Sequence, residues 1–283
     1  AIATVLRERL KEILGLANTQ DSNREYLFSG YQTLVQPFVQ NANGIFSYNG
    51  DQGERTLQIS SGRNIADSHN GLDVFANIFN GNGTFQVNDA SANTGSGVIS
   101  VGQVTNTTTY VEDTYTITFV TNSAGNLAYN VFGATGGQII PPLPQNSVTN
   151  APDYVSGAGI NFNGIETTIS ETPAVGDTFT ISPSTKQNVF VTINNLITAL
   201  GVDTGTATGD AKRNNQMARA IQDIDQTIDN MIRIRTDIGA RLKTIDDQKE
   251  TNTNFIFEME ETRSQTRDLN ITEAITQLTT RLT

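Results

Sequence analysis

The C-terminal segment from Asp210 to Thr283 contains no proline and a single glycine, Gly239. Because these two residues disfavour helix most strongly, their near absence over 74 residues predicts a helix of unusual length. Apolar residues recur here at alternating spacings of four and three, which is typical of a coiled coil. This seam runs through Ile221, Ile224, Ile228, Met231, Ile238, Leu242 and Ile245, and it resumes at Ile256, Met259, Ile275 and Leu278. A shift of register predicts a break near Asp268 to Asn270.

Two shorter helices are predicted outside this segment. One follows Ser184, which begins a capping-box pattern, and stops at Gly201. The other opens the chain and ends near Asn18, and its apolar stripe consists of Ile2, Leu6, Leu10, Ile13 and Ala17.

The two terminal helices differ greatly in expected length. At 1.5 Å per residue the first spans about 27 Å and the last about 110 Å. Most of the long seam therefore lacks a partner within the chain, and we expect it to be covered by a segment cut from a longer parent or by another subunit. Burial should accordingly be graded, with a closed core at Ile221, Ile224, Ile228 and Met231 and much greater exposure at Ile256, Met259, Ile275 and Leu278.

The block from 43 to 183 has a different composition, with 18 of the 24 glycines and six of the seven prolines. Apolar residues alternate with polar ones there, as in Tyr115, Ile117 and Phe119, and this period of two predicts half-buried strands. We therefore predict an α+β multidomain protein. An elongated coiled-coil-type helical domain, formed by 1–42 and 184–283 with a β-hairpin at about 24–40, carries an inserted all-β domain at 43–183, either a sandwich or a small barrel.

The amino-acid composition excludes most kinds of catalytic and metal site. The chain has no cysteine and one histidine, His69, which excludes thiolate chemistry and multi-histidine metal centres, so no catalytic, cofactor-binding or metal residue is predicted. His69 is interpreted as a solvated loop residue. The formal net charge of −11 argues against nucleic acid as a partner, and no apolar run is long enough to span a membrane.

Several stretches carry a resemblance to a known family. They are Leu14 to Tyr31, Tyr48 to Arg55 and Gly71 to Phe75, then Gly176 to Ile181, Gly239 to Leu242 and Arg267 to Ile275. Together they resemble the flagellin superfamily and, within it, the hook-filament junction family. Arg24 stands where that family often has glycine.

The resemblance implies a structural subunit of the bacterial flagellum that adapts hook to filament and polymerises through its helices, without enzymatic activity or cofactor. The implied partners are hook-associated protein 1, flagellin, the filament capping protein during assembly and neighbouring copies of the chain. It also implies export by the flagellar type III pathway to an extracellular location, and a monomeric state for a fragment without the polymerising terminal helices. Two alternatives stay open, a flagellin-type filament subunit and a surface adhesin or glycan-binding module.

Overall fold

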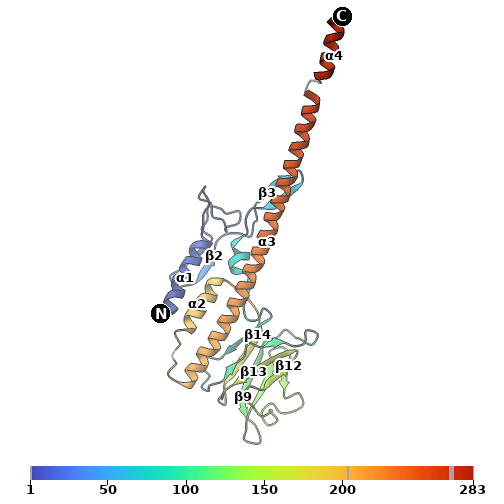
Figure 1. Ribbon diagram of the computed structural model, residues 1–283. Helices are drawn as coiled ribbons and strands as arrows, with labels where there is room; N and C mark the ends of the chain where they lie inside the picture. The colour runs from blue at the N-terminus through green and yellow to red at the C-terminus, as the bar shows by residue number, and fades with distance from the viewer. Residues whose placement is uncertain (1, 203, 268–270, 283) are drawn as a thin grey trace. The chain divides into compact units, whose positions relative to one another are not determined.

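The computed structural model describes residues 2–202, 204–267 and 271–282 (Figure 1). Backbone contacts divide the chain into two compact units. The first comprises residues up to Arg55 together with Ser68–Ile234, and the second comprises Thr56–Asp67 together with the residues from Arg235 onward.

The helices bear out the pattern of the flanking sequences. They are α1 (Ile2–Ala17), α2 (Val189–Ala199), α3 (Ala207–Arg267) and α4 (Ile271–Leu282), with a π-helical turn, η1, at Leu72–Ala76. The expected break near Asp268 to Asn270 lies outside the described residues. Because α3 alone has 61 residues, the prediction of one unusually long helix is confirmed.

Two sheets of the first unit share one hydrophobic cluster. One sheet has the strand order β11-β10-β9-β14-β6, and in the other β12, β13 and β7 lie side by side while β8 also pairs with β13. Their pairings are antiparallel. The strands are β6 (Phe85–Asp89), β7 (Val98–Ile99), β8 (Gln103–Val104), β9 (Tyr115–Thr121), β10 (Leu127–Gly133), β11 (Gly137–Ile140), β12 (Gly159–Phe162), β13 (Ile165–Ser170) and β14 (Thr178–Pro183).

The predicted alternation is confirmed on the central strand β9. Tyr115, Ile117 and Phe119 are at most 1% exposed, whereas the threonines between them lie on the other, half-buried face. Phe179 and Ile181 of the neighbouring β14 are fully buried in the same cluster. The period of two in the sequence thus identifies the core-facing side of the sheet.

A second hydrophobic cluster lies between α1, α2 and the loops that precede the sheets. Its centre is Phe190 of α2, whose ring lies 5.1 Å from the rings of both Phe38 and Phe46. Phe75 of η1 also stacks on Phe190 at 6.2 Å. Apolar packing therefore joins the parts of 43–55 and 68–83 that carry these residues to the helices of the first unit, although their composition resembles that of the β block.

Short strands complete this helical part. They are β1 (Phe38–Gln40) paired with β2 (Phe46–Tyr48), and β5 (Ile78–Phe79) paired with β15 (Lys186–Gln187). The hairpin therefore lies at 38–48 and not at about 24–40, where turns fill residues 27–36.

The start of α2 differs from the expected capping box. Asn188 caps the helix, and its side-chain oxygen accepts a hydrogen bond from the backbone N–H of Val191 at 2.8 Å. Ser184 donates to the carbonyl of Asn80 instead, because the residues after it form β15. The helix therefore begins only at Val189, after the residues that pair with β5.

Close backbone approaches occur within the stretch from Tyr48 to Arg55, which is one of those that carry the sequence resemblance. The hydroxyl of Tyr48 donates to the carbonyls of Phe28 and Asp51, and the Asp51 carboxylate accepts from the N–H groups of Tyr31 and Gly53. A Cβ atom at Gly50 would lie 2.5 Å from the Tyr48 hydroxyl, so only glycine fits there. Burial raises the pKa of Tyr48 to about 12, which keeps this hydroxyl a donor.

The second unit contains a hairpin of its own, made of β3 (Thr56–Ser60) and β4 (Arg63–Ala66). It lies against the part of α3 that belongs to this unit, where Arg241 donates a hydrogen bond to the carbonyl of Ala66. Leu57 and Ile59 follow the same alternation that predicts half-buried strands across 43–183. Ile59 is half-buried, but Leu57 is 57% exposed because a two-stranded hairpin covers little surface.

The separation of the two clusters generates a prediction about deletion of the β block. The backbone N–H of Ser184 donates to the carbonyl of Thr84 at 3.0 Å, so the chain enters and leaves the block at adjacent points. Replacing 85–183 by a short glycine-serine linker should leave the helices folded, with the helical circular dichroism signal retained. Deleting 43–183 should abolish it, because that change also removes Phe46, Val74, Phe75 and Ile78 from the helical cluster. Equal loss of helix in both variants would contradict the prediction.

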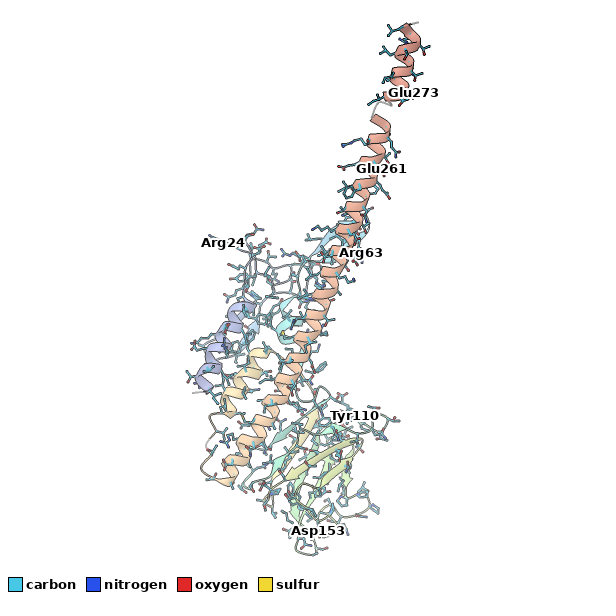
Figure 2. All side chains as sticks on the ribbon, viewed as in Figure 1. Arg24, Arg63, Tyr110, Asp153, Glu261 and Glu273 are labelled. Carbon is cyan, nitrogen blue, oxygen red and sulfur yellow. The ribbon has the colours of Figure 1, made fainter. Side chains whose placement is uncertain are left out.

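The turn at Arg24 generates a second prediction. Arg24, at the edge of the loops in Figure 2, has a φ of 65°, in the left-handed region that favours glycine. The change Arg24→Gly should raise the free energy of unfolding by roughly 0.5 to 1 kcal/mol, measured by chemical denaturation. The control Asn23→Gly should lower it, because Asn23 does not have a positive φ. A stabilising control or a destabilising Arg24→Gly would show that backbone strain at this turn is unimportant.

Candidate functional site

A row of polar side chains on the first part of α3 holds the preceding loops and the edge of the β block. We call it the polar stripe, and it consists of Thr208, Lys212, Asn215, Arg219, Asp223 and Asn230. Spacings of three, four and seven place these residues on one helix face. Most of their partners are backbone atoms, at distances between 2.6 and 3.2 Å.

Asn215 shows how such a contact works. Its side-chain oxygen accepts from the N–H of Ile99 at 2.9 Å, and its nitrogen donates to the carbonyl of Gly97 at 3.2 Å. The residue is 2% exposed. Because both ends of the amide are bonded to one strand and the residue before it, the helix can sit in one rotational setting only.

Asp223 is the buried carboxylate of the polar stripe. It accepts from the N–H of Gly81 at 2.7 Å and from the Gln187 side chain at 2.8 Å. Burial raises the pKa of this carboxyl, opposed by those two hydrogen bonds and by the nearby Arg219. Arg219 itself pairs with Asp89 at 2.7 Å.

The predicted seam lies on the face of α3 opposite the polar stripe, since at 100° per residue Ile221, Ile224 and Ile228 fall roughly on the far side. The expectation of a closed core is wrong at two positions, because Ile221 is 52% and Ile228 50% exposed. Ile224 and Met231 are half-buried. The hydrogen bonds of the polar stripe turn the polar face of α3 toward the β block, so the apolar face points away from that block.

An apolar groove of about 470 Å³ lies beside this face. It is lined by Ile13 and Leu16 of α1, Phe75 of η1, and Thr227 and Met231 of α3, with further residues from the loop after α1 and from α2. Leu16 is 58% exposed at its edge. Leu10 is buried in the helical cluster, and Leu6 and Ile13 are half-buried against it.

In the second unit the seam is exposed throughout its described length. Ile238, Leu242 and Ile245 are 40 to 57% exposed, and Ile256, Met259, Ile275 and Leu278 are 57 to 61% exposed. Figure 2 shows the side chains around Glu261 and Glu273 standing out from α3 and α4, with no other described element of that unit beside them. The distal residues are exposed as expected, but Ile221 and Ile228 are nearly as exposed, so the expected grading of burial is wrong at those two positions.

The structure adds residues that the heptad pattern did not include. Ile234 is the large apolar residue of α3 that is well buried, at 5% exposure, and Ile232, Phe255 and Phe257 are exposed at 54 to 65%. Phe255 and Phe257 lie outside the seam, so apolar side chains surround much of the helix near Ile256. The run of three apolar residues, Phe255, Ile256 and Phe257, was the sequence signal that could have predicted this.

His69 is not the solvated residue that we expected. It is 8% exposed, and its Nδ1 lies 3.7 Å from a carboxylate oxygen of Glu54. The loop folds back toward the residues before Thr56, which buries the ring.

The described residues contain no group of three or more His, Cys, Asp or Glu side chains placed to hold a metal ion. Among the helices of the same described ranges, none combines the length and apolar character that crossing a bilayer requires.

The buried carboxylate generates a prediction about pH. Because burial raises the pKa of Asp223 from its ordinary value of 3.8, the folded protein binds this proton more readily than the unfolded chain, so the carboxylate lowers stability as pH rises above that value. Asp223→Asn should therefore gain stability relative to the wild type between about pH 4 and pH 7, measured by urea unfolding. Asp225→Asn, an exposed neighbour, controls for loss of one charge. A pH-independent difference for Asp223→Asn would contradict the prediction.

Comparison with known proteins identifies the family. No family model matches the chain. A 78-residue segment is 35% identical to flagellar hook-associated protein 3 of Salmonella typhimurium, and it spans 28% of this chain and about a quarter (24%) of that relative.

Solved structures cover far more of the chain. The flagellar junction protein FlgL of Legionella pneumophila is 35% identical with a TM-score of 0.82, over 87% of this chain and 79% of that one. A hook-associated protein 3 structure from the same species is 33% identical with a TM-score of 0.90, over 94% of this chain and 81% of that one. FlgL of Xanthomonas campestris is 28% identical with a TM-score of 0.81, over 93% of this chain and 81% of that one. With two matches above 30% identity over most of both chains, this chain belongs to the family of flagellar hook-associated protein 3, the junction protein FlgL.

Proposed function

We propose that the chain is a structural subunit that adapts the hook to the filament of a bacterial flagellum and assembles through the exposed apolar faces of α3 and α4. One observation supports this proposal most strongly. Ile256, Met259, Ile275 and Leu278 are each more than half exposed along one pair of helices. Burying a large apolar side chain stabilises by about 1.5 to 3 kcal/mol, so such a row in water favours association.

The partners in this proposal follow from the family. They are hook-associated protein 1 on one side, flagellin on the other, the filament capping protein during assembly, and neighbouring copies of the chain. Export by the flagellar type III pathway would place the subunit outside the cell. The comparisons do not favour a filament subunit or an adhesin, because the matched relatives carry hook-associated or junction names.

The same proposal assigns roles within the chain. The helices supply the coiled-coil-type contacts of a tube, and the two sheets at 85–183 form a sandwich that faces outward. The proposed role is mechanical, with no substrate and no turnover, in keeping with relatives that are structural flagellar proteins. The net charge of −7 over 85–183, where seven Asp or Glu residues face no Lys or Arg, would keep this outer block soluble and repel its copies.

A single substitution on α4 tests the proposal. Ile275→Asp should change the free energy of unfolding by less than about 0.5 kcal/mol, because Ile275 is 58% exposed. In the bacterium that encodes the protein, the same change should abolish swimming by weakening assembly. The matched control is Gln277→Asp, a polar and exposed position on the same helix that should leave swimming intact.

A second control separates assembly from folding. Ile234→Asp buries a charge in the helical cluster and should destabilise the isolated chain by several kcal/mol, about 3 or more. Normal swimming with Ile275→Asp, or an unfolded Ile275→Asp protein, would refute the proposed role of this face.

A further inference from the structure

A polar cavity of about 270 Å³ lies where β6, β15, α2 and the polar stripe of α3 meet. Side-chain amides dominate its lining, from Gln86 and Asn88 of β6, Gln187 of β15 and Gln216 of α3. Arg219 and Asp223 supply one charge of each sign. The cavity belongs entirely to the first unit, and it is separate from the apolar faces of the proposed assembly role.

Part of this hydrogen-bonding capacity is unused. Asp223 and Gln187 are already bonded to each other, but the side-chain amides of Asn88 and Gln216 have no hydrogen-bond partner among the described residues. Each of these half-buried amides offers two donors and an acceptor to the cavity. Neither amide is among the buried polar atoms that lack a partner, so solvent can reach both, and a ligand in the cavity would take the place of that water.

The charges of the lining limit what that molecule can be. Arg219 is neutralised by Asp89 at 2.7 Å, and Asp223 is a second acid, so no free positive charge is available for an anion. Asp223 already accepts two hydrogen bonds, which weakens its attraction for a cation. Hydroxyl groups both donate and accept, and they therefore match a wall of amides beside a carboxylate.

The size of the cavity supports an organic ligand over a single structural water. Its volume of about 270 Å³ is many times the roughly 10 to 15 Å³ that a cavity needs to hold one water molecule. We propose that this cavity binds a neutral polyhydroxylated molecule of monosaccharide size, held by Asn88, Gln216 and Asp223. Binding would tie β6 to α3 and α2 through the ligand, beside the point where the chain enters the β block.

The test is a titration followed by nitrogen-proton correlation NMR on the full chain. The probes are glucose, galactose, mannose and rhamnose, each raised to about 100 mM, with inorganic phosphate and ethanolamine as charged comparisons. We expect saturable shifts of the Asn88 and Gln216 side-chain amides with at least one sugar. Each of the variants Asn88→Ala and Gln216→Ala should weaken that binding by about fivefold, the value of one neutral hydrogen bond.

Asn214→Ala is the matched control, because this exposed asparagine lies on α3 and is not part of the cavity lining. It should bind the sugar as the wild type does. Absence of saturable shifts with all four sugars, shifts caused by phosphate or ethanolamine alone, or unchanged binding in both alanine variants would overturn the proposal. The result is independent of swimming, so it leaves the assembly role unaffected.

Discussion

The hydrogen bonds between the polar stripe of α3 and the backbone of the preceding block constrain the rest of the first unit. Buried amides and carboxylates are costly unless each finds its partner, so only one rotation of the helix satisfies Asn215 and Asp223 together. An apolar interface would tolerate small rotations, because dispersion and burial are not directional. The polar contacts therefore fix the rotation of α3 about its own axis.

The direction of the apolar face follows from this fixed rotation. Ile221 and Ile228 lie opposite the polar stripe and stay half exposed, although the sequence marks them as core positions. The α3 residues that fill the helical cluster are Ile234 and, in part, Met231. Exposure of a regular apolar row over both units is what a subunit of an assembly needs, and it is costly for a chain that remains alone.

The nature of the partners also explains how the β block is attached. The polar stripe bonds mainly to carbonyls and N–H groups, as at Ser91, Thr94 and Gly97, and the Asp89 carboxylate is a side-chain exception. Backbone atoms are present whatever the side chain, so such an attachment tolerates sequence change in the block. One of the stretches that resemble the family, Tyr48 to Arg55, contains a close approach of another kind, because a Cβ atom at Gly50 would lie 2.5 Å from the Tyr48 hydroxyl.

The sequence by itself determined the elements whose cause is local. The absence of proline and the single glycine after Asp210 favoured the long helix, and the alternation through Tyr115, Ile117 and Phe119 identified the buried face of the sheet. Tertiary structure decided which face of the long helix is covered, because a heptad pattern shows that a stripe is apolar without showing what packs on it. It also placed Asn188 as the cap of α2, buried His69, and assembled the amide-lined cavity from β6, β15 and α3. These features depend on residues that are far apart in the chain and meet only after the strands have paired.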